Sequence, residues 1–315
     1  MNILITAIGG DIAQSIAKIL RNSNFVKRII GTDISDNHAG KFFVDEVIKI
    51  PDANDPNYLE YIKSIVNMNK INFIIPVNEK EIYNIANYIK NNESDRFNDK
   101  VIIPKTNGFF NFFDKLKTIK YLESLKLDIG LPWTVDTEET PLSFPCIFKS
   151  KETSGSKSVR KVTRDLYALH KKEFTNGVFQ ELLLPNDKEY TCGIYRASHS
   201  KKTFVIILHR QLKGGLTGYA KVVFEKYINN YCETIADAIE LEGSINIQLI
   251  KTNNGPKLFE INPRFSSTVI FRHHLGFEDL IWSIKERLDL NFNMEFDINK
   301  VINKKFYRIY TELYE

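Results

Sequence analysis

The sequence predicts an α/β domain with a doubly wound parallel sheet, followed by a region of α+β architecture. Strand-like and helix-like segments alternate through the first third of the chain, which is typical of a parallel sheet covered by helices. From Pro145 onward the pattern changes to strands, hairpins and glycine-rich turns with fewer helices. We place the boundary between the two regions near 105–113.

Each element of the first region follows from a local pattern. Short runs of β-branched and other apolar residues predict buried strands, and Ile12, Ile16, Ile19 and Leu20 recur at helical spacing. Polar stretches such as 91–95 separate the elements. The predicted strands are 2–7, 29–33, 73–77 and 101–104, and the predicted helices lie near 12–20, 58–66 and 81–89.

The second region begins with a helix at 115–125, for which Asp114 is a good N-cap. Alternating segments then predict strands, and the aromatic tail from Lys304 predicts one more. The predicted strands are 144–149, 178–183, 244–250 and 257–262, with a last one within 304–315.

Composition narrows the class of protein. The 315 residues carry a formal net charge of +4, with 43% hydrophobic and 26% charged residues, as in an ordinary soluble protein. The lysines are scattered among acids, which argues against nucleic acid as the main partner. No apolar run is long enough to cross a membrane. Three widely spaced cysteines and an N-terminus without a basic region predict a reducing cytoplasm.

The segment 257–262, followed at once by Pro263 and Arg264, carries the chemistry. Positions two apart share a face of a strand, so Glu260 and Asn262 point together, while Phe259 and Ile261 face the other way. Two oxygen donors beside a guanidinium suit a magnesium-bound phosphate. The alternative is a hairpin that merely has a polar face.

A preceding strand, 244–250, contributes a third oxygen donor. Residues 252–256 between the two strands have the composition of a turn. If the loop has an odd number of residues centred on Asn254, Gln248 pairs directly with Glu260. All three donors then lie on one face of the hairpin.

This hairpin resembles the metal and phosphate site of ATP-grasp enzymes, in particular the carbamoyl-phosphate synthetase large-chain branch and related carboxylate–amine ligases. The likeness rests on Gln248 followed by Glu260-x-Asn262-Pro263-Arg264. It implies ATP as substrate, ADP as product, and Mg²⁺ or Mn²⁺ held by Gln248, Glu260 and Asn262. Arg264 would stabilise the phosphoryl group during transfer.

Two lysines occur where the family has basic residues near the nucleotide phosphates. Lys115 opens the predicted helix after Asp114; a solvated lysine is the alternative, and Lys117 is a less favoured substitute. Lys149 ends the strand 144–149 and is implied both to bind the nucleotide and to take part in catalysis.

A run of small polar residues follows Lys149. Its backbone N–H groups and hydroxyls suit a loop that closes over phosphates, and the resemblance assigns this role to Ser154, Gly155 and Ser156. The family often has proline directly after the lysine, where this chain has Ser150. A mobile surface hairpin is the alternative.

The segment 178–191 resembles the hinge between the two ATP-grasp subdomains. Backbone groups of Glu181, Leu182 and Leu183 would then bind the adenine edge, and Glu189 would accept hydrogen bonds from the ribose hydroxyls. The residue pattern of this segment is weakly specific. It supports the resemblance because it occurs between Lys149 and Gln248, where the order of the ATP-grasp motifs requires a hinge.

Arg210 lies in a basic segment that ends in Gly214 and Gly215. Its fork of N–H donors is suited to clamp the carboxylate of a substrate, so we count it among the catalytic candidates. A glycine hairpin turn is the alternative. The hydroxyls of 266–268 could contact the acceptor substrate or cap the helix that follows.

The turn Ile8-Gly9-Gly10 and Asp33 invite a dinucleotide-binding interpretation, but Ile8 stands where the first glycine is needed. The resemblance instead implies a Rossmann-like domain that binds no nucleotide and helps to shape the acceptor site. Gly9, Gly10 and Asp11, with Asn78 and Glu79, would then contact substrate.

Together these assignments predict a Rossmann-like domain at 1–108, a small ATP-grasp subdomain at 109–180 with the phosphate loop, and a large subdomain at 181–315 with the metal site. The resemblance implies a ligase that joins a small-molecule carboxylate to an amine or ammonia through an acyl phosphate. Related enzymes are often dimers, so a homodimer is one expectation, and the sequence leaves the oligomeric state open.

Three alternatives remain at this point. Carbamoyl-phosphate-synthetase-like phosphoryl transfer is chemically near, although the chain holds one ATP-binding unit and no glutaminase-like cysteine motif. An ATP-binding module without ligase activity would keep the same residues. An NAD-dependent oxidoreductase would leave Glu260 and Asn262 unexplained.

Overall fold

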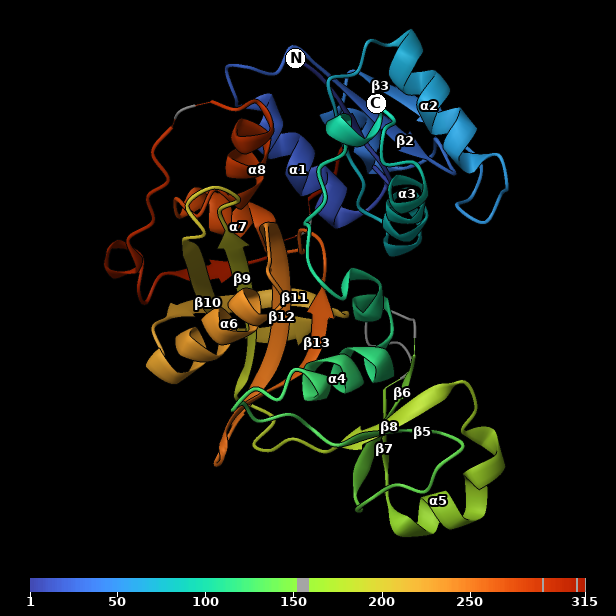
Figure 1. Cartoon of the computed structure of the whole chain (residues 1–315), viewed down its shortest axis with the longest axis vertical. Helices are drawn as coiled ribbons and strands as arrows, with labels where there is room; N and C mark the ends of the chain where they lie inside the picture. Colours follow the sequence, from blue (N-terminus) through green and yellow to red (C-terminus); the bar gives the residue numbers. More distant parts are fainter. Residues whose placement is uncertain (152–158, 291, 310, 315) are drawn as a thin grey trace.

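The computed structural model describes residues 1–151, 159–290, 292–309 and 311–314. Within these residues the strands form one parallel sheet, one large antiparallel sheet and one small antiparallel sheet (Figure 1). The predicted fold class, an α/β domain followed by α+β architecture, is confirmed.

The N-terminal sheet has the order β3-β2-β1-β4, and its strands are all parallel. The order reverses between β1 and β4, so the loops at the carboxyl ends of these two strands flank a crevice. The strands are β1 (Asn2–Ile5), β2 (Arg28–Asp33), β3 (Glu46–Lys49) and β4 (Phe73–Ile75).

Two expectations for this sheet were wrong. The short strand β3 was missed because its ends are exposed and its four residues show no apolar run. The segment 101–104 was expected to be a strand, but Val101 makes only an isolated parallel bridge to Ile74. Pro104 lacks the N–H that would extend the ladder.

Helices cover both faces of the parallel sheet. Alternate strand residues pack on α1 on one face and on α2 and α3 on the other. The predicted apolar stripe of the first helix is confirmed, since Ile16, Ile19 and Leu20 are buried. The helices are α1 (Asp11–Arg21), α2 (Tyr58–Met68) and α3 (Glu79–Asn91).

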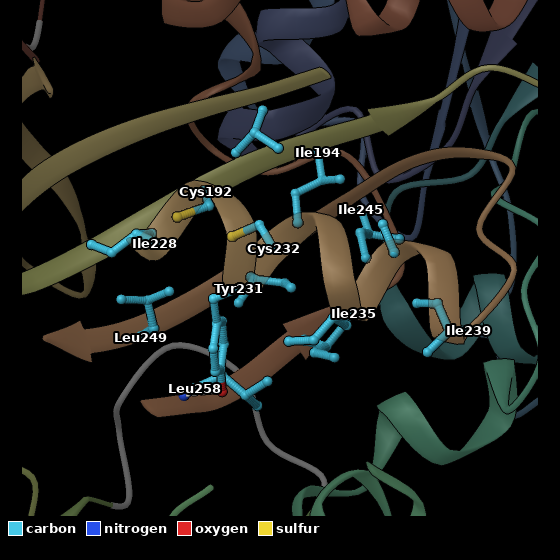
Figure 2. Packing of buried hydrophobic residues seen from close by; sticks show 14 of the residues in the cluster. Cys192, Ile194, Ile228, Tyr231, Cys232, Ile235, Ile239, Ile245, Leu249 and Leu258 are labelled. Atoms are coloured by element: carbon cyan, nitrogen blue, oxygen red, sulfur yellow. Dashed lines mark hydrogen bonds between the residues drawn. The ribbon is translucent and has the colours of Figure 1, made fainter. Parts of the chain in front are cut away.

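The large sheet has the order β13-β12-β9-β10-β11-β14 and carries α6 (Lys226–Ala238) on one face. Figure 2 shows Tyr231, Cys232 and Ile235 of this helix against apolar side chains of the sheet. The strands are β9 (Glu189–Arg196), β10 (Thr203–Lys213), β11 (Leu216–Val223), β12 (Gly243–Thr252), β13 (Gly255–Asn262) and β14 (Lys305–Tyr307).

The small sheet, of order β5-β8-β6-β7, lies at the opposite end of the molecule from the N-terminal sheet (Figure 1). It packs on α5 (Arg164–His170) through aromatic side chains, and α4 (Lys115–Ser124) lies between it and the large sheet. The strands are β5 (Thr134–Asp136), β6 (Cys146–Ser150), β7 (Arg160–Val162) and β8 (Gly177–Glu181).

Two helices join the N-terminal domain to the large sheet. Val269 of α7 (Val269–His274) and Leu280 of α8 (Asp279–Arg287) belong to the same apolar cluster as α1. The loop that leaves β13 therefore runs directly from the hairpin to the N-terminal domain. The subdomain boundaries at 108 and 180 stay a prediction.

Two further observations concern the compartment and the membrane. The three cysteines are buried and form no disulfide. Among the residues that the structure describes, no helix has the length and apolar character needed to span a bilayer.

Candidate active site

The β12–β13 hairpin brings the predicted oxygen donors together. Gln248 pairs with Glu260, and Asn246 pairs with Asn262 one step along the ladder. The expected pairing of Gln248 with Glu260 is therefore confirmed, but its expected cause was wrong. The turn between Thr252 and Gly255 has two residues, and a β-bulge at Phe259 restores the register.

The bulge also changes which way the strand faces. Leu258 and Ile261, three residues apart, both enter the apolar core. The ring of Phe259 lies under the ammonium of Lys149, 4.5 Å from it. The expectation that Phe259 faces away from the site together with Ile261 was wrong, because the extra residue interrupts the alternation.

Two of the three proposed metal ligands are open to the pocket. Within the described part of the chain, neither the Glu260 carboxylate nor the Asn262 side-chain amide makes a hydrogen bond, and both line a pocket. The described residues hold no cluster of three or more His, Cys, Asp or Glu that could bind a metal. A cation bound here would need amide oxygens as ligands beside Glu260, which hard cations accept, and the metal roles of Glu260 and Asn262 stay a prediction.

Gln248 is engaged differently. Arg210 Nη2 donates to Gln248 Oε1 at 2.7 Å, and the same guanidinium donates through Nε to Glu189 Oε1 at 2.9 Å. The Arg210 side chain is 8% exposed, so this contact is shielded from water. The fork that was expected to clamp a substrate carboxylate clamps Glu189 instead, and the metal role of Gln248 stays a prediction.

Lys149 lies close enough to Glu260, Lys115 and Glu189 to interact with their charges. Its Nζ donates to Gln180 Oε1 at 2.9 Å, and Gln180 is fixed in turn by donating to Thr134 Oγ1. Burial lowers the pKa of Lys149 to about 8, although the nearby Glu260 carboxylate favours the charged form. The nearby charge of Lys115 also lowers the pKa of Lys149.

Lys115 sits at the first position of α4, as expected, and Asp114 Oδ1 caps the helix by accepting from Lys117 N. With Glu260, Asn262 and Glu79, Lys115 lines a small pocket beside the hairpin. The side chain of Lys117 is exposed. The structure thus brings Lys115, rather than Lys117, to the oxygen donors.

Residues of the expected hinge connect the small sheet to the large one. Glu181 ends β8, and its carboxylate accepts from Lys257 Nζ at 2.8 Å, while its backbone N–H donates to Trp133 O. Leu183 is buried, and Glu189 opens β9. Leu182 and Leu183 lie between these strands, and their adenine contacts stay a prediction. Ser154, Gly155 and Ser156 lie outside the described residues.

Arg264 joins the hairpin to the N-terminal domain. Its Nη2 donates to Glu79 Oε1 at 2.7 Å, where Glu79 begins α3 at the carboxyl end of β4. Glu79 therefore lies beside the hairpin, and its contact with a substrate stays a prediction. Arg264 must exchange this partner before it can bind a phosphate.

A pocket of about 190 Å³ lies between the N-terminal domain and the hairpin, and we call it the interdomain pocket. Its walls come from α1, the large sheet and the loop after β13. Its lining residues are Asp11, Ile12, Thr191, Arg210, Leu212, Gly215, Leu216, Thr217, Asn246, Gln248, Glu260, Asn262, Arg264, Ser266 and Ser267.

Sequence reasoning missed several residues of this site. Gln180, Thr191, Thr217, Asn246 and Arg308 reach it or brace it. Asn246 had a usable signal, since it lies two residues before Gln248 on the same strand and so shares its face. Arg308, beyond the last strand, had none.

Side chains of the N-terminal domain occupy the space around Gly9, in the turn between β1 and α1. Gly9 N donates to Asp33 Oδ2 at 2.9 Å, and a Cβ on Gly9 would lie 3.1 Å from the His38 ring. The amide and the carboxylate that a dinucleotide would need are therefore bonded to each other. This contact argues against the dinucleotide interpretation.

Two family models match the chain. Residues 178–305 match a model described as an ATP-grasp in the biosynthetic pathway with Ter operon, and residues 3–99 match the N-terminal domain of PylC-like proteins. The first match spans the hairpin, Arg210 and the hinge. Residues 178–305 thus match an ATP-grasp family model.

Solved structures share this ATP-grasp architecture. An ADP complex of purK, an N5-carboxyaminoimidazole ribonucleotide synthetase, has 14% identity and a TM-score of 0.72, covering 94% of this chain and 78% of that one. Biotin carboxylase from Campylobacter jejuni, in a complex with β,γ-ATP, has 14% identity and a TM-score of 0.68, covering 96% and 73%.

A third structure is the biotin carboxylase domain dimer of Hydrogenobacter thermophilus 2-oxoglutarate carboxylase, with MgADP, ADP and bicarbonate. It has 12% identity and a TM-score of 0.66, covering 96% of this chain and 72% of that one. No curated protein matches the chain in sequence. At these identities the likeness concerns the ATP-grasp fold, and the carbamoyl-phosphate synthetase branch stays a prediction.

Proposed function

We propose that this ATP-grasp protein is a ligase that uses ATP and Mg²⁺ to join a carboxylate to an amine. The observation that carries the proposal is the gathering of Lys149, Lys115, Glu260 and Asn262 at one place beside a pocket. Cations for phosphate oxygens and hard oxygen donors for a metal are what phosphoryl transfer needs.

In this proposal each residue has a role in the first step. Lys149 and Lys115 hold the phosphates of ATP, and Arg264 leaves Glu79 to offset charge on the γ-phosphate. Mg²⁺ held by Glu260 and Asn262 would neutralise charge on the phosphate oxygens. A carboxylate oxygen attacks the γ-phosphorus, the bond to the β-phosphate oxygen breaks, and ADP leaves.

The second step takes place in the interdomain pocket. The amine nitrogen attacks the acyl carbon, the carbon–oxygen bond to the phosphate breaks, and inorganic phosphate leaves with a proton from the nitrogen. The protein supplies no nucleophile of its own. Its contribution is to hold both substrates in reactive geometry and to limit water at the acyl phosphate.

The contact of Arg210 with Gln248 bears on the metal site. A guanidinium that donates to Gln248 Oε1 competes with a cation for the same oxygen. We therefore propose Glu260 and Asn262 as the principal ligands, with Gln248 joining them only when Arg210 turns away. The resemblance assigned all three residues equally.

The proposal is tested by release of ADP and phosphate from ATP and Mg²⁺, across a panel of carboxylates with and without ammonia and amines. We expect stimulation by one carboxylate–amine pair. Glu260→Gln should lower that rate at least about 100-fold, since it weakens the metal site. Glu123→Gln, which changes an exposed glutamate on α4, is the matched control and should leave the rate unchanged.

Two outcomes would contradict the proposal. If ATP with Mg²⁺ does not bind in a calorimetric titration, the assignment of the nucleotide site is wrong. If ATP binds and no pair in the panel releases ADP, the protein is an ATP-binding module instead. Carbamoyl-phosphate formation from bicarbonate and ammonia is scored separately in the same assay.

A further inference from the structure

The interdomain pocket contains polar atoms that have no partner in the protein. Asp11 Oδ2, Thr217 Oγ1 and Asn246 Nδ2 are buried, and none of them makes a hydrogen bond within the described residues. Thr217 is 0% exposed and Asn246 is 1% exposed. These residues come from α1, β11 and β12, so three separate elements each bring an unsatisfied group to the pocket.

An unsatisfied buried polar group destabilises the fold, and three of them around one pocket suit a ligand that supplies their partners. The three atoms differ in whether they can donate or accept a hydrogen bond. A carboxylate oxygen only accepts, an amide nitrogen only donates, and a hydroxyl does both. The matching ligand must therefore carry a donor toward Asp11 and an acceptor toward Asn246.

The charges around the pocket indicate the kind of donor. Arg210 is neutralised by Glu189, and Arg264 is neutralised by Glu79. Asp11 Oδ2 accepts no hydrogen bond, and a carboxylate favours a cationic donor over a neutral one, because charge-assisted hydrogen bonds are about twice as strong. Asp11 thus favours a protonated amine.

Arg308 offsets only part of the Asp11 charge. Its Nη1 lies 3.5 Å from Asp11 Oδ2 without a hydrogen bond between them. Its Nε donates to Thr217 O and its Nη2 donates to Ser267 O, so Nη1 is the nitrogen that faces Asp11. Arg308 therefore braces the pocket walls and forms an ion pair with Asp11, while Asp11 Oδ2 still has no hydrogen-bond donor.

The position of Asp11 also argues against a phosphorylated substrate. Asp11 is the first residue of α1, where helix N–H groups often bind phosphate. A carboxylate at this place repels phosphate and attracts a cation. The pocket thus selects for an amine and against a phosphate at the N-terminal domain.

We propose that the interdomain pocket binds an α-amino acid, with its ammonium on Asp11 and its carboxyl oxygens on Asn246 Nδ2 and Thr217 Oγ1. This inference rests on the proposed function, in which the same pocket receives the second substrate. It identifies the substrate class as amino acids rather than phosphorylated compounds or free ammonia.

The test measures binding directly. The probes are the twenty proteinogenic L-amino acids, their N-acetyl derivatives and ribose 5-phosphate, each followed by thermal shift and calorimetry. Every probe is tested with and without a non-hydrolysable ATP analogue and Mg²⁺. We expect a subset of amino acids to bind, while their N-acetyl forms and ribose 5-phosphate do not.

Matched variants connect binding to the pocket. Asp11→Asn should weaken amino-acid binding by about tenfold or more, and Thr217→Val should weaken it by about fivefold. Neither variant should change binding of the ATP analogue. Asp165→Asn, in the first turn of α5, and Thr32→Val, another buried threonine with an unpartnered hydroxyl, are the controls. Both should bind like the wild type.

The proposal is overturned if no amino acid binds, if the N-acetyl forms bind equally well, or if Asp11→Asn binds amino acids like the wild type. These outcomes are distinct from failure of the proposed function. That failure appears as absent binding of the ATP analogue, whereas amino-acid binding is also measured without it.

Discussion

A single half-buried lysine dominates the electrostatics beside the hairpin. Lys149 is half-buried, donates to Gln180 and lies over the ring of Phe259. Burial penalises its charged form, so its pKa falls to about 8 instead of its ordinary value of 10.5. The residue type and its place at a strand end are visible in the sequence, but the depth of burial is not.

The lowered pKa of Lys149 predicts a pH dependence. Below about pH 8 the free protein carries the ammonium that binds phosphates, and above it the neutral amine predominates. We expect kcat/KM for ATP to fall as pH rises through about 8. The inflection in kcat should lie at higher pH, because bound phosphates favour the ammonium.

A Lys149→Met variant gives the control for this profile. It should lower kcat/KM for ATP by roughly 100-fold and remove the inflection, since the titrating group is gone. Lys117→Met, which changes an exposed lysine in α4, should keep both the rate and the profile. An inflection that persists in Lys149→Met would assign it to another group.

At the scale of the element, the β12–β13 hairpin decides which side chains meet. A regular strand would have sent Phe259 and Ile261 to the same face. The bulge instead sends Phe259 to the site and lets Leu258 and Ile261 share the core. One extra residue in the ladder thus adds an aromatic ring beneath Lys149.

We expect Phe259→Leu to keep the bulge and the fold while removing the ring beneath Lys149. A cation–π contact contributes about 0.5–2 kcal/mol, so KM for ATP should rise by roughly twofold to thirtyfold. Phe42→Leu removes an exposed ring beside Lys41 and is the control. Steady-state kinetics are the measurement, and equal KM values in both variants would assign the ring no role in ATP binding.

At the scale of the whole molecule, a buried ion pair holds the loop beside the interdomain pocket. Arg272 of α7 donates to Asp279 Oδ2 at 2.6 Å and to Ser266 Oγ at 2.8 Å. Asp279 also accepts from Ser244 of β12. Gly193 of β9 makes room, because a Cβ there would lie 2.5 Å from Arg272 Cδ.

Removing one member of this pair leaves an uncompensated buried charge. We expect Asp279→Ala to lower the free energy of unfolding by about 3–5 kcal/mol. Asp237→Ala breaks the surface pair with Arg196 and should cost less than about 1 kcal/mol. Urea denaturation measures both variants.

A double variant separates the ion pair from simple packing. Arg272→Met with Asp279→Leu replaces both charges by apolar groups and should recover most of the lost stability. If the double variant is less stable than Asp279→Ala, the arginine stabilises the fold through packing rather than through its charge.

The sequence by itself determined the local order of the molecule. Alternating segments gave the α/β and α+β regions, Asp114 marked the start of a helix, and Glu260-x-Asn262 marked the site. These features depend on neighbours a few residues apart, whose periodicity and capping chemistry are written in the chain.

Only the tertiary structure decided which side chains from different elements lie together. The bulge at Phe259, the capture of Gln248 by Arg210, and the meeting of Asp11 with Asn246 join residues that lie far apart in the chain or depend on strand register. A residue pattern shows which way a side chain points along its own element. It does not show what another element places opposite, because that depends on how the sheets and helices pack.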